Sequence, residues 1–330
     1  MTELLLAVDG GNAKTDLALI SAEGELIALA RGPGSSPHEH GLEGALDRIE
    51  ALLVQALDGR AHAPIASADL LLAGVDFPGE VVAARERVEQ RGWARHVVVG
   101  NDTLALLRTG TDRGWGVAVV CGAGINCLGV GPDGRQAWFP ALGDITGDWG
   151  GGYDLGLAAI AAAARSEDGR GPATSLEQRV PAHFGVASML ELAEAVHLGR
   201  LRKRRFVELA PIVIAEAGSD EVAREIVRRL ADEIVAFVRV ALARIGPLGE
   251  PAEIVLGGGI LGARDPLLNG AVDAGLAGLG VPLFTTVVDS PPVVGAALLG
   301  LDRVGAPPSA HARLRRELHP DEPLAEVLHG

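Results

Sequence analysis

A turn near the amino terminus, DGGNAKT at positions 9–15, has the composition of a phosphate-binding loop. It separates the apolar stretches 4–8 and 16–20, which the pattern predicts to be strands. Asp9 can hold a divalent cation through water. The residues that can offer backbone or side-chain donors to a phosphate are Gly10, Gly11, Asn12, Lys14 and Thr15. The run fits a tight hairpin with solvated polar residues equally well, and it is not a Walker A loop because Ala13 precedes Lys14.

Two later glycine turns also follow apolar stretches. The first is CGAGINC at 121–127, directly after the strand expected over 117–120. The second follows the strand expected over 253–256 and matches G-x-G-x-x-G from Gly257 to Gly262. A Rossmann fingerprint needs an acidic residue about 20 positions later at a strand end, and Asp273 comes too early for that role. The glycines alone therefore favour contact with a nucleotide, without a dinucleotide-binding fold.

Two aspartates occupy positions suited to catalysis or substrate binding. Asp102 ends the predicted strand 97–99, and catalytic groups of α/β sheets usually lie at such strand ends. Asp148 lies in a glycine turn, GDWGGG at 147–152, ahead of a helix. Either residue alone also fits a helix cap or a turn. His38 and His40 are two positions apart with no third ligand near them in sequence, so no metal site is predicted there.

The composition narrows the functional classes. The net charge of -14 disfavours binding to nucleic acid or to an anionic membrane surface, because the overall field repels phosphate. The two cysteines, Cys121 and Cys127, do not make a disulfide framework and favour a reducing cytoplasm. There is no apolar run near the roughly 20 residues that span a bilayer and no signal-peptide pattern, so we expect a cytoplasmic protein.

The order of elements indicates two similar α/β halves. Strands over 4–8, 16–20 and 26–30 form a meander, followed by a helix over 42–57, a strand over 70–75, a helix over 81–91 and the strand 97–99. The meander pattern returns at 117–120, 128–130 and 136–139, each time through a glycine turn and then an acidic-glycine turn. Helical patterns dominate 155–245, and another helix is expected near 293–301. The proline- and charge-rich tail from Pro307 is expected to be loosely docked or disordered.

In this order the motifs resemble the sugar kinase, Hsp70 and actin superfamily, and within it the N-acetylglucosamine kinase group of the BadF/BadG/BcrA/BcrD-type ATPase family. The resemblance runs from residue 4 to about 301 and implies an α/β fold of two duplicated actin-like ATPase (ribonuclease H-like) domains with a cleft between them. It implies domains over 1–114, completed by a helix over 292–305, and over 115–291, with a tail over 306–330.

The resemblance also implies ATP and Mg²⁺ as cofactors and assigns residues to them. The positions that match the two phosphate loops and the adenosine motif are Gly10, Gly11, Asn12, Lys14, Thr15, Gly122, Ala123, Gly257, Gly258 and Gly259, with Mg²⁺ near Asp9 through water. Asp102 matches the catalytic aspartate. The positions that match sugar-binding residues are Ser36, Asp76, Asn101, Gly124, Ile125, Asn126 and Asp148. Ser36 stands where the family often carries Asn, and Ile125 stands where a small polar residue commonly faces the acetamido group.

The implied function is ATP-dependent phosphorylation of the 6-hydroxyl of an amino sugar, with N-acetylglucosamine as first choice and glucosamine or another hexosamine as the alternative. A homodimer is also implied. The family contains activator ATPases that share an iron–sulfur cluster between subunits, but here the two cysteines lie six apart inside the second phosphate hairpin. The related sugar-responsive repressors need an N-terminal DNA-binding helix pair and a cysteine-rich zinc loop, which this sequence lacks.

Overall fold

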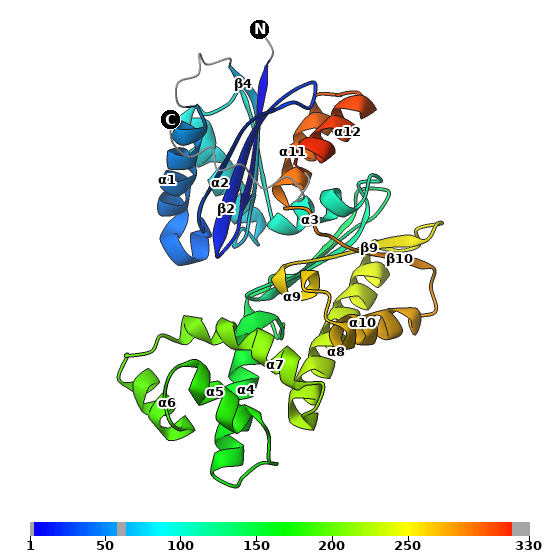
Figure 1. The fold of residues 1–330 in the computed structure, drawn as a ribbon. Coiled ribbons are helices and arrows are strands. Elements are labelled where there is room, and N and C mark those ends of the chain that lie inside the picture. The colour runs from blue at the N-terminus through cyan, green and yellow to red at the C-terminus, as the bar shows by residue number, and fades with distance from the viewer. Residues whose placement is uncertain (1–2, 58–63, 319–330) are drawn as a thin grey trace. The chain divides into compact units, whose positions relative to one another are not determined.

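The computed structural model describes residues 3–57 and 64–318 (Figure 1). The strands are β1 (Leu4–Gly10), β2 (Lys14–Ser21), β3 (Leu26–Pro33), β4 (Ile65–Leu72), β5 (His96–Gly100), β6 (Gly116–Cys121), β7 (Ile125–Val130), β8 (Gln136–Trp138), β9 (Ala252–Gly257) and β10 (Leu283–Val287). The helices are α1 (Pro37–Leu57), α2 (Pro78–Arg91), α3 (Asp102–Gly110), α4 (Gly151–Glu167), α5 (Leu176–His183), α6 (Met189–His197), α7 (Ala210–Glu216), α8 (Glu221–Ile245), α9 (Gly259–Gly262), α10 (Pro266–Ala277), α11 (Val293–Arg303) and α12 (Pro308–Glu317), with short 3₁₀ turns η1 (Gly143–Ile145) and η2 (Lys203–Leu209). The chain divides into two compact units, residues 1–116 with 288–330 (unit 1) and residues 117–287 (unit 2).

Unit 1 is built on one mixed sheet in the order β3-β2-β1-β4-β5. The meander β1–β2–β3 is antiparallel, whereas β1, β4 and β5 run parallel. β1 and β4 are apolar and buried on both faces, as expected for central strands covered by helices on each side. Helices α1 and α2 cover one face, and α3, α11 and α12 cover the other (Figure 1).

Unit 2 repeats this topology. Its sheet has the order β10-β9-β6-β7-β8, so β6–β7–β8 corresponds to the meander of unit 1 and β9 and β10 correspond to β4 and β5. β9 lies parallel to both β6 and β10. The same strand order with the same directions confirms the duplication that the repeated glycine turns indicated. In unit 2 the segment after the meander is expanded into the helices α4–α8, whose buried faces pack with α10 on the sheet.

The structure corrects three sequence-based expectations about elements. The strand expected over 70–75 is β4, which begins at Ile65 and ends at Leu72. The short helix α3 and the edge strand β10 were not predicted, since neither carries a clear periodic pattern. The tail was expected to be loosely docked from Pro307, but Pro308–Glu317 form α12, with Ala310 and Leu314 buried. The tail expectation for residues 319–330 lies outside the described residues.

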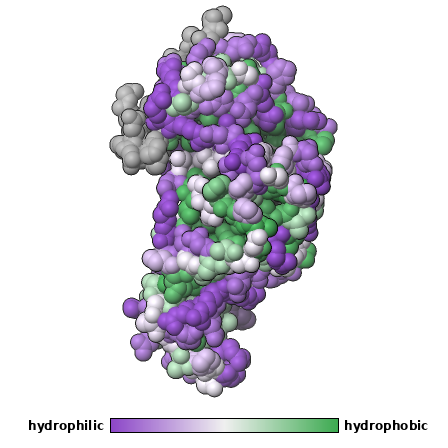
Figure 2. All heavy atoms as spheres, turned by 90° about the vertical axis from the view of Figure 1, so that its right-hand side faces the viewer, coloured by the Kyte–Doolittle hydropathy of each residue, from purple (hydrophilic) through white to green (hydrophobic). Residues whose placement is uncertain are grey.

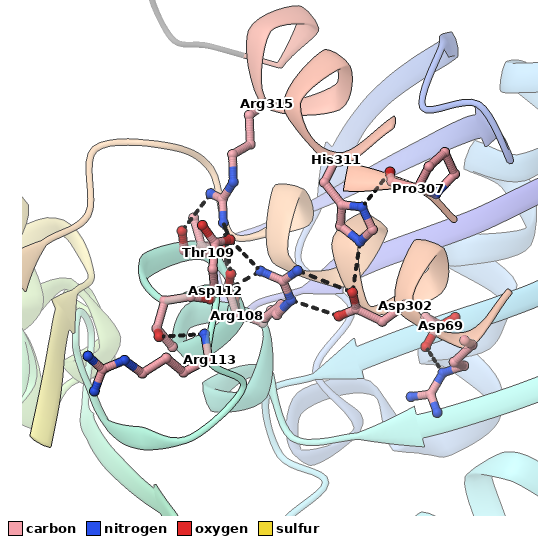
Figure 3. A network of polar contacts seen from close by, with 12 residues as sticks. Asp69, Arg108, Thr109, Asp112, Arg113, Asp302, Pro307, His311 and Arg315 are labelled. Carbon is pink, nitrogen blue, oxygen red and sulfur yellow. Dashed lines mark hydrogen bonds and ion pairs between the residues drawn. The ribbon is translucent and has the colours of Figure 1, made fainter. Parts of the chain in front are cut away.

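Charged side chains fix α12 to its neighbours in unit 1 (Figure 3). Arg108 on α3 donates from Nε and Nη2 to the two carboxylate oxygens of Asp302 on α11, at 2.7 and 3.2 Å. Arg315 on α12 donates to the Thr109 carbonyl and to Asp112, each at 2.8 Å. His311 lies 2.8 Å from Asp302. Because the contacts of Arg108 with Asp302 and of Arg315 with Thr109 and Asp112 join residues about 200 positions apart, no local sequence pattern indicates them.

Candidate active site

The parallel strands of unit 1 bring their polar ends to one edge of the sheet. Gly10 pairs in register with Leu72, and Leu71 pairs with Gly100, so the segments that follow β1, β4 and β5 lie side by side. These segments carry Asp9 at the end of β1, Asp76 beyond β4 and Asn101-Asp102 beyond β5. Such an edge is where α/β sheets bind ligands.

Asn101 caps the helix that begins at Asp102. It is the N-cap of α3, and its Oδ1 accepts hydrogen bonds from the Thr103 backbone N–H at 3.0 Å and from the Thr103 hydroxyl at 2.6 Å. Its Nδ2 donates to Asp76 Oδ1 at 2.7 Å. Asp102 is the first residue of α3 and is only partly exposed. Burial raises the pKa of its carboxyl to about 6, although hydrogen bonds from the backbone oppose the shift. A base with a pKa near neutrality suits proton transfer at physiological pH.

Asp9 has an unfavourable electrostatic environment. Burial raises its pKa well above the usual range, and the nearby carboxylates of Asp102 and Asp16 raise it further. The nearby cations Lys14 and Arg31 lower the pKa of Asp9 only in part, because both pair with Asp16: Lys14 Nζ lies 3.1 Å from one of its oxygens and Arg31 Nε 2.5 Å from the other. A cation bound next to Asp9 would relieve this repulsion, and an all-oxygen set of carboxylates and water is what Mg²⁺ prefers. The residues therefore fit the magnesium site that the resemblance implies.

The charge on Asp102 has a consequence for stability that needs no ligand. Its pKa is 3.8 in the unfolded chain and about 6 in the folded protein, so the folded state resists ionisation. The resulting penalty is absent well below pH 3.8, grows as the pH rises through the range between the two pKa values, and is complete well above pH 6. We expect Asp102→Asn to raise the free energy of unfolding at pH 7.5 by about 1–2 kcal/mol, because each pKa unit is worth about 1.4 kcal/mol and partial exposure reduces the effect.

Urea unfolding of the wild type and Asp102→Asn at pH 4 and pH 7.5 measures this. Most of the gain should be lost at pH 4, where the carboxyl is protonated in the folded state and only partly ionised in the unfolded chain. Asp112→Asn is the matched control, and it should lower the free energy of unfolding at pH 7.5 instead of raising it. The reason is that the Arg315 side chain lowers the pKa of Asp112. A stabilisation of Asp102→Asn that is equal at both pH values would show that its cause is not the buried charge.

The first turn of unit 1 offers fewer side-chain donors than its composition indicates. The Thr15 hydroxyl is fully buried and bonds within the unit: it donates to the Pro33 carbonyl at 2.9 Å and lies 2.8 Å from the Ser35 hydroxyl. Asn12 and Lys14 are exposed, while Gly11 bonds to the Lys14 carbonyl and closes the hairpin. Of the five donors that the sequence assigned to phosphate, Thr15 instead ties the hairpin to the segment 33–35.

In unit 2 the two glycine turns lie at the same sheet edge. Val120 pairs with Gly257, so the turn after β6 and the turn after β9 are neighbours. A Cβ on Gly258, which has φ +89°, would lie 2.4 Å from the Cys121 carbonyl oxygen. The N-terminus of α4 supports the first turn, because the Gly152 and Tyr153 N–H groups donate to the carbonyls of Gly122 and Ala123 at 2.8 and 2.9 Å.

Other glycines in these turns are not required by the fold. A Cβ on Gly122, Gly124 or Gly259 would have no protein atom within 4 Å, and none of the three has a positive φ. The backbone at these positions is therefore bare and open toward solvent. Exposed N–H groups without side chains around them are the usual device for binding phosphate groups. This arrangement fits the triphosphate of a nucleotide.

The remaining residues assigned to the sugar in unit 2 differ in their environment. Asp148 is partly exposed, and its Oδ2 accepts a hydrogen bond from the Gly143 N–H at 2.8 Å, which closes the turn ahead of α4. Asn126 Oδ1 accepts from the N–H of Cys127 at 2.7 Å. Ile125 is buried in the core, where its side chain packs against Gly150 in the turn ahead of α4.

Both cysteines lie inside the core of unit 2. Cys121 and Cys127 are exposed to 0% and 1%, and burial raises the pKa of the Cys121 thiol to about 12. Neither thiol can reach a metal cluster shared between subunits. Among the described residues there is also no group of three or more His, Cys, Asp or Glu side chains arranged to hold a metal. No helix in the described ranges is long and apolar enough to cross a membrane.

The two duplicated sheets, with glycine turns and aspartates at strand ends, define an actin-like ATPase fold. The family model of the BadF/BadG/BcrA/BcrD ATPase family matches residues 6–300, and the chain therefore belongs to that family. A kinase of Clostridium acetobutylicum named for N-acetylmuramic acid and N-acetylglucosamine is 25% identical over 78% of this chain and 85% of its own length. The N-acetyl-D-glucosamine kinase of Dictyostelium discoideum is 23% identical over 91% of this chain and 98% of its own length.

A solved structure has the same fold. A Chromobacterium violaceum protein, whose name proposes N-acetylglucosamine kinase activity, superimposes with a TM-score of 0.72 at 24% identity and covers 91% of this chain and 99% of its own. At that level of identity the likeness establishes the fold and not the substrate.

Proposed function

We propose that the protein is an ATP-dependent kinase that phosphorylates the 6-hydroxyl of an amino sugar, with N-acetylglucosamine as the first choice and glucosamine as the second. The observation that carries this proposal is the carboxylate of Asp102, which lies beyond a strand end, at the start of the helix that Asn101 caps, and has a pKa of about 6. Membership of an ATPase family implies ATP as the donor, and the two curated relatives act on N-acetylated amino sugars by name.

The reaction follows from these groups. Asp102 orients the sugar hydroxyl and accepts its proton as the hydroxyl oxygen forms a bond to the γ-phosphorus. The bond between the γ-phosphorus and the bridging oxygen breaks, and ADP leaves. The bare amide at Gly124 binds the phosphate oxygens, whose charge it stabilises, whereas the Gly122 N–H already donates to the Gly124 carbonyl at 2.9 Å. Mg²⁺ held near Asp9 through water would supply charge neutralisation on the phosphates.

The activator ATPases of the family are the alternative, and the cysteines argue against it. A shared cluster needs thiolates at a subunit surface, whereas Cys121 and Cys127 are buried in the core. The protein as purified should therefore be colourless. Cytoplasmic location remains part of this proposal, since ATP and reduced cysteines are found there.

ADP release in a coupled assay tests the proposal. The panel is N-acetylglucosamine, glucosamine, N-acetylmannosamine, N-acetylmuramic acid and glucose, each with ATP and Mg²⁺. We expect release to depend on sugar and to be fastest with N-acetylglucosamine. Absence of turnover with every sugar, or ADP release that is equal without sugar, would contradict the kinase function.

We further propose that the protein forms a homodimer through β10. Within residues 3–57 and 64–318 this edge strand pairs with β9 alone, its sequence LFTTV has no charge, and Phe284 is 59% exposed. Hydrophobic side chains are exposed on the side of the molecule where β10 and α10 lie (Figure 2). An uncharged open edge favours pairing with a second strand, and a two-fold axis would let β10 of two copies pair antiparallel.

Light scattering coupled to size-exclusion chromatography should give about twice the monomer mass of 34.0 kDa. Phe284→Lys should shift the protein to monomer, because edge charges oppose strand pairing. A wild-type protein that stays monomeric over a roughly 50-fold range of protein concentration would exclude this dimer.

A further inference from the structure

Ser36, which the resemblance assigned to the sugar, does not reach solvent. Its exposure is 0%, and its Oγ has no hydrogen-bond partner among the described residues. The hydroxyl lies against Gly74, where a Cβ would come within 2.8 Å of it. The Ser36 carbonyl accepts hydrogen bonds from the N–H groups of Glu39 and His40. Ser36 therefore anchors the start of α1 and does not present its side chain to a ligand.

His38, two residues later, lies on the exposed side of the same segment. Its side chain is 44% exposed, and its Nε2 lies 3.7 Å from Asp76 Oδ2. The ring packs beside Gly74, whose φ is +79°, and a Cβ at Gly74 would lie 3.0 Å from the ring Cγ. The backbone at Gly74 thus leaves room for the imidazole and holds it beside Asp76.

Asp76 connects this imidazole to the end of α3. Its side chain is only 5% exposed, and its Oδ1 accepts a hydrogen bond from Asn101 Nδ2 at 2.7 Å. Asn101 caps α3, whose first residue is Asp102. The polar contacts therefore run from His38 through Asp76 to Asn101, which directly precedes Asp102 in the sequence. All four residues belong to unit 1. The contact with Gly74 positions the imidazole next to this carboxylate.

We propose that His38 is a specificity-determining residue that binds a ring hydroxyl of the acceptor sugar, in the role that the sequence gave to Ser36. This inference rests on the proposed kinase function. One carboxylate oxygen of Asp76 lies beside the imidazole and the other accepts from the Asn101 amide. A sugar bound by His38 would therefore have a defined position with respect to Asp102. An imidazole can hydrogen-bond to a hydroxyl, which fits a pyranose.

Kinetics of His38→Ala test this inference. We expect the KM for N-acetylglucosamine to rise at least tenfold, with kcat within about threefold of wild type and the KM for ATP unchanged, because the lost contact is made equally in the ground and transition states. His38→Asn should recover part of the loss, since its amide can also bond to a hydroxyl. His40→Ala is the matched control, because His40 lies two residues on beside Glu39, away from Asp76.

Binding separates this inference from the proposed function. The rise in melting temperature caused by saturating N-acetylglucosamine should be smaller in His38→Ala, while the rise caused by ATP and the melting temperature without ligand stay as in wild type. An equal sugar-induced rise in both proteins would overturn the role of His38. So would a Ser36→Ala variant that raises the sugar KM when His38→Ala does not. Failure of the wild type to release ADP with any sugar would instead contradict the kinase function.

Discussion

Asp102→Asn should lower kcat by roughly 10²–10⁴-fold and leave the KM for ATP nearly unchanged. The substitution keeps the size of the side chain and the start of α3, but an amide cannot take the proton of the sugar hydroxyl. The caps that Asn101 provides to Thr103 do not involve the Asp102 side chain, so the local backbone should persist. Initial rates at varied sugar and ATP concentrations measure the effect.

Asp148→Asn is the comparison for this variant. Asp148 lies in a turn of unit 2, where one of its oxygens closes the turn by accepting from Gly143. It is suited to bind ring hydroxyls, and its substitution should mainly raise the KM for sugar. If Asp102→Asn keeps near-normal turnover while Asp148→Asn abolishes it with sugar still bound, the two roles are reversed. Normal turnover by both variants would place the catalytic site elsewhere.

Arg108→Met should destabilise unit 1 by about 3 kcal/mol, the upper end of the range for losing hydrogen bonds to a charged group, because the guanidinium is buried although Asp302 is 42% exposed. The Arg108 side chain is 7% exposed, and its guanidinium bonds to Asp302, Asp112 and the Thr111 carbonyl (Figure 3). Methionine fills much of the space, so the loss reports on polar contacts and not on a cavity. At 2–4 °C per kcal/mol, the melting temperature should fall by roughly 6–12 °C.

Arg315→Met is the milder control for Arg108→Met. Arg315 also bonds to Asp112, but its side chain is 32% exposed, so its ion pair is worth about 1 kcal/mol or less. Arg108→Lys separates charge from geometry, since an ammonium cannot match the two-oxygen contact with Asp302. A melting temperature of Arg108→Met equal to that of Arg315→Met would show that the network does not stabilise α3 and α11.

The fold could be predicted in outline because its strongest signals are local. Each meander begins with an apolar strand that enters a glycine turn, and the repeat of that pattern indicated the duplication which the two identical strand orders confirm. Asp102 was found because it follows a run of valines at a strand end. The helix α12 was missed because its stability depends on contacts such as Arg315 with Asp112, which are distant in sequence.

The environments of the candidate site residues were harder to predict. The composition of the first turn suggested that Thr15 donates to phosphate, but its hydroxyl bonds to Pro33 and Ser35, which only the packing of β2 on β3 brings near. The same limit applies to residues 36–38. Sequence position favoured Ser36 as the sugar-binding residue, but its side chain is buried against Gly74. His38 is instead exposed beside Asp76. Burial of small polar side chains depends on tertiary contacts that spacing does not encode.

The most direct test of the central claim is the identity of the product formed from ATP, Mg²⁺ and N-acetylglucosamine. A phosphorus–proton correlation spectrum of the reaction mixture shows which sugar proton couples to the new phosphate. We predict a phosphomonoester coupled to the two protons on carbon 6, formed in equal amount to ADP, and its absence with Asp102→Asn on the same timescale. Free orthophosphate in place of the ester, or coupling to the proton on carbon 1, would contradict the account.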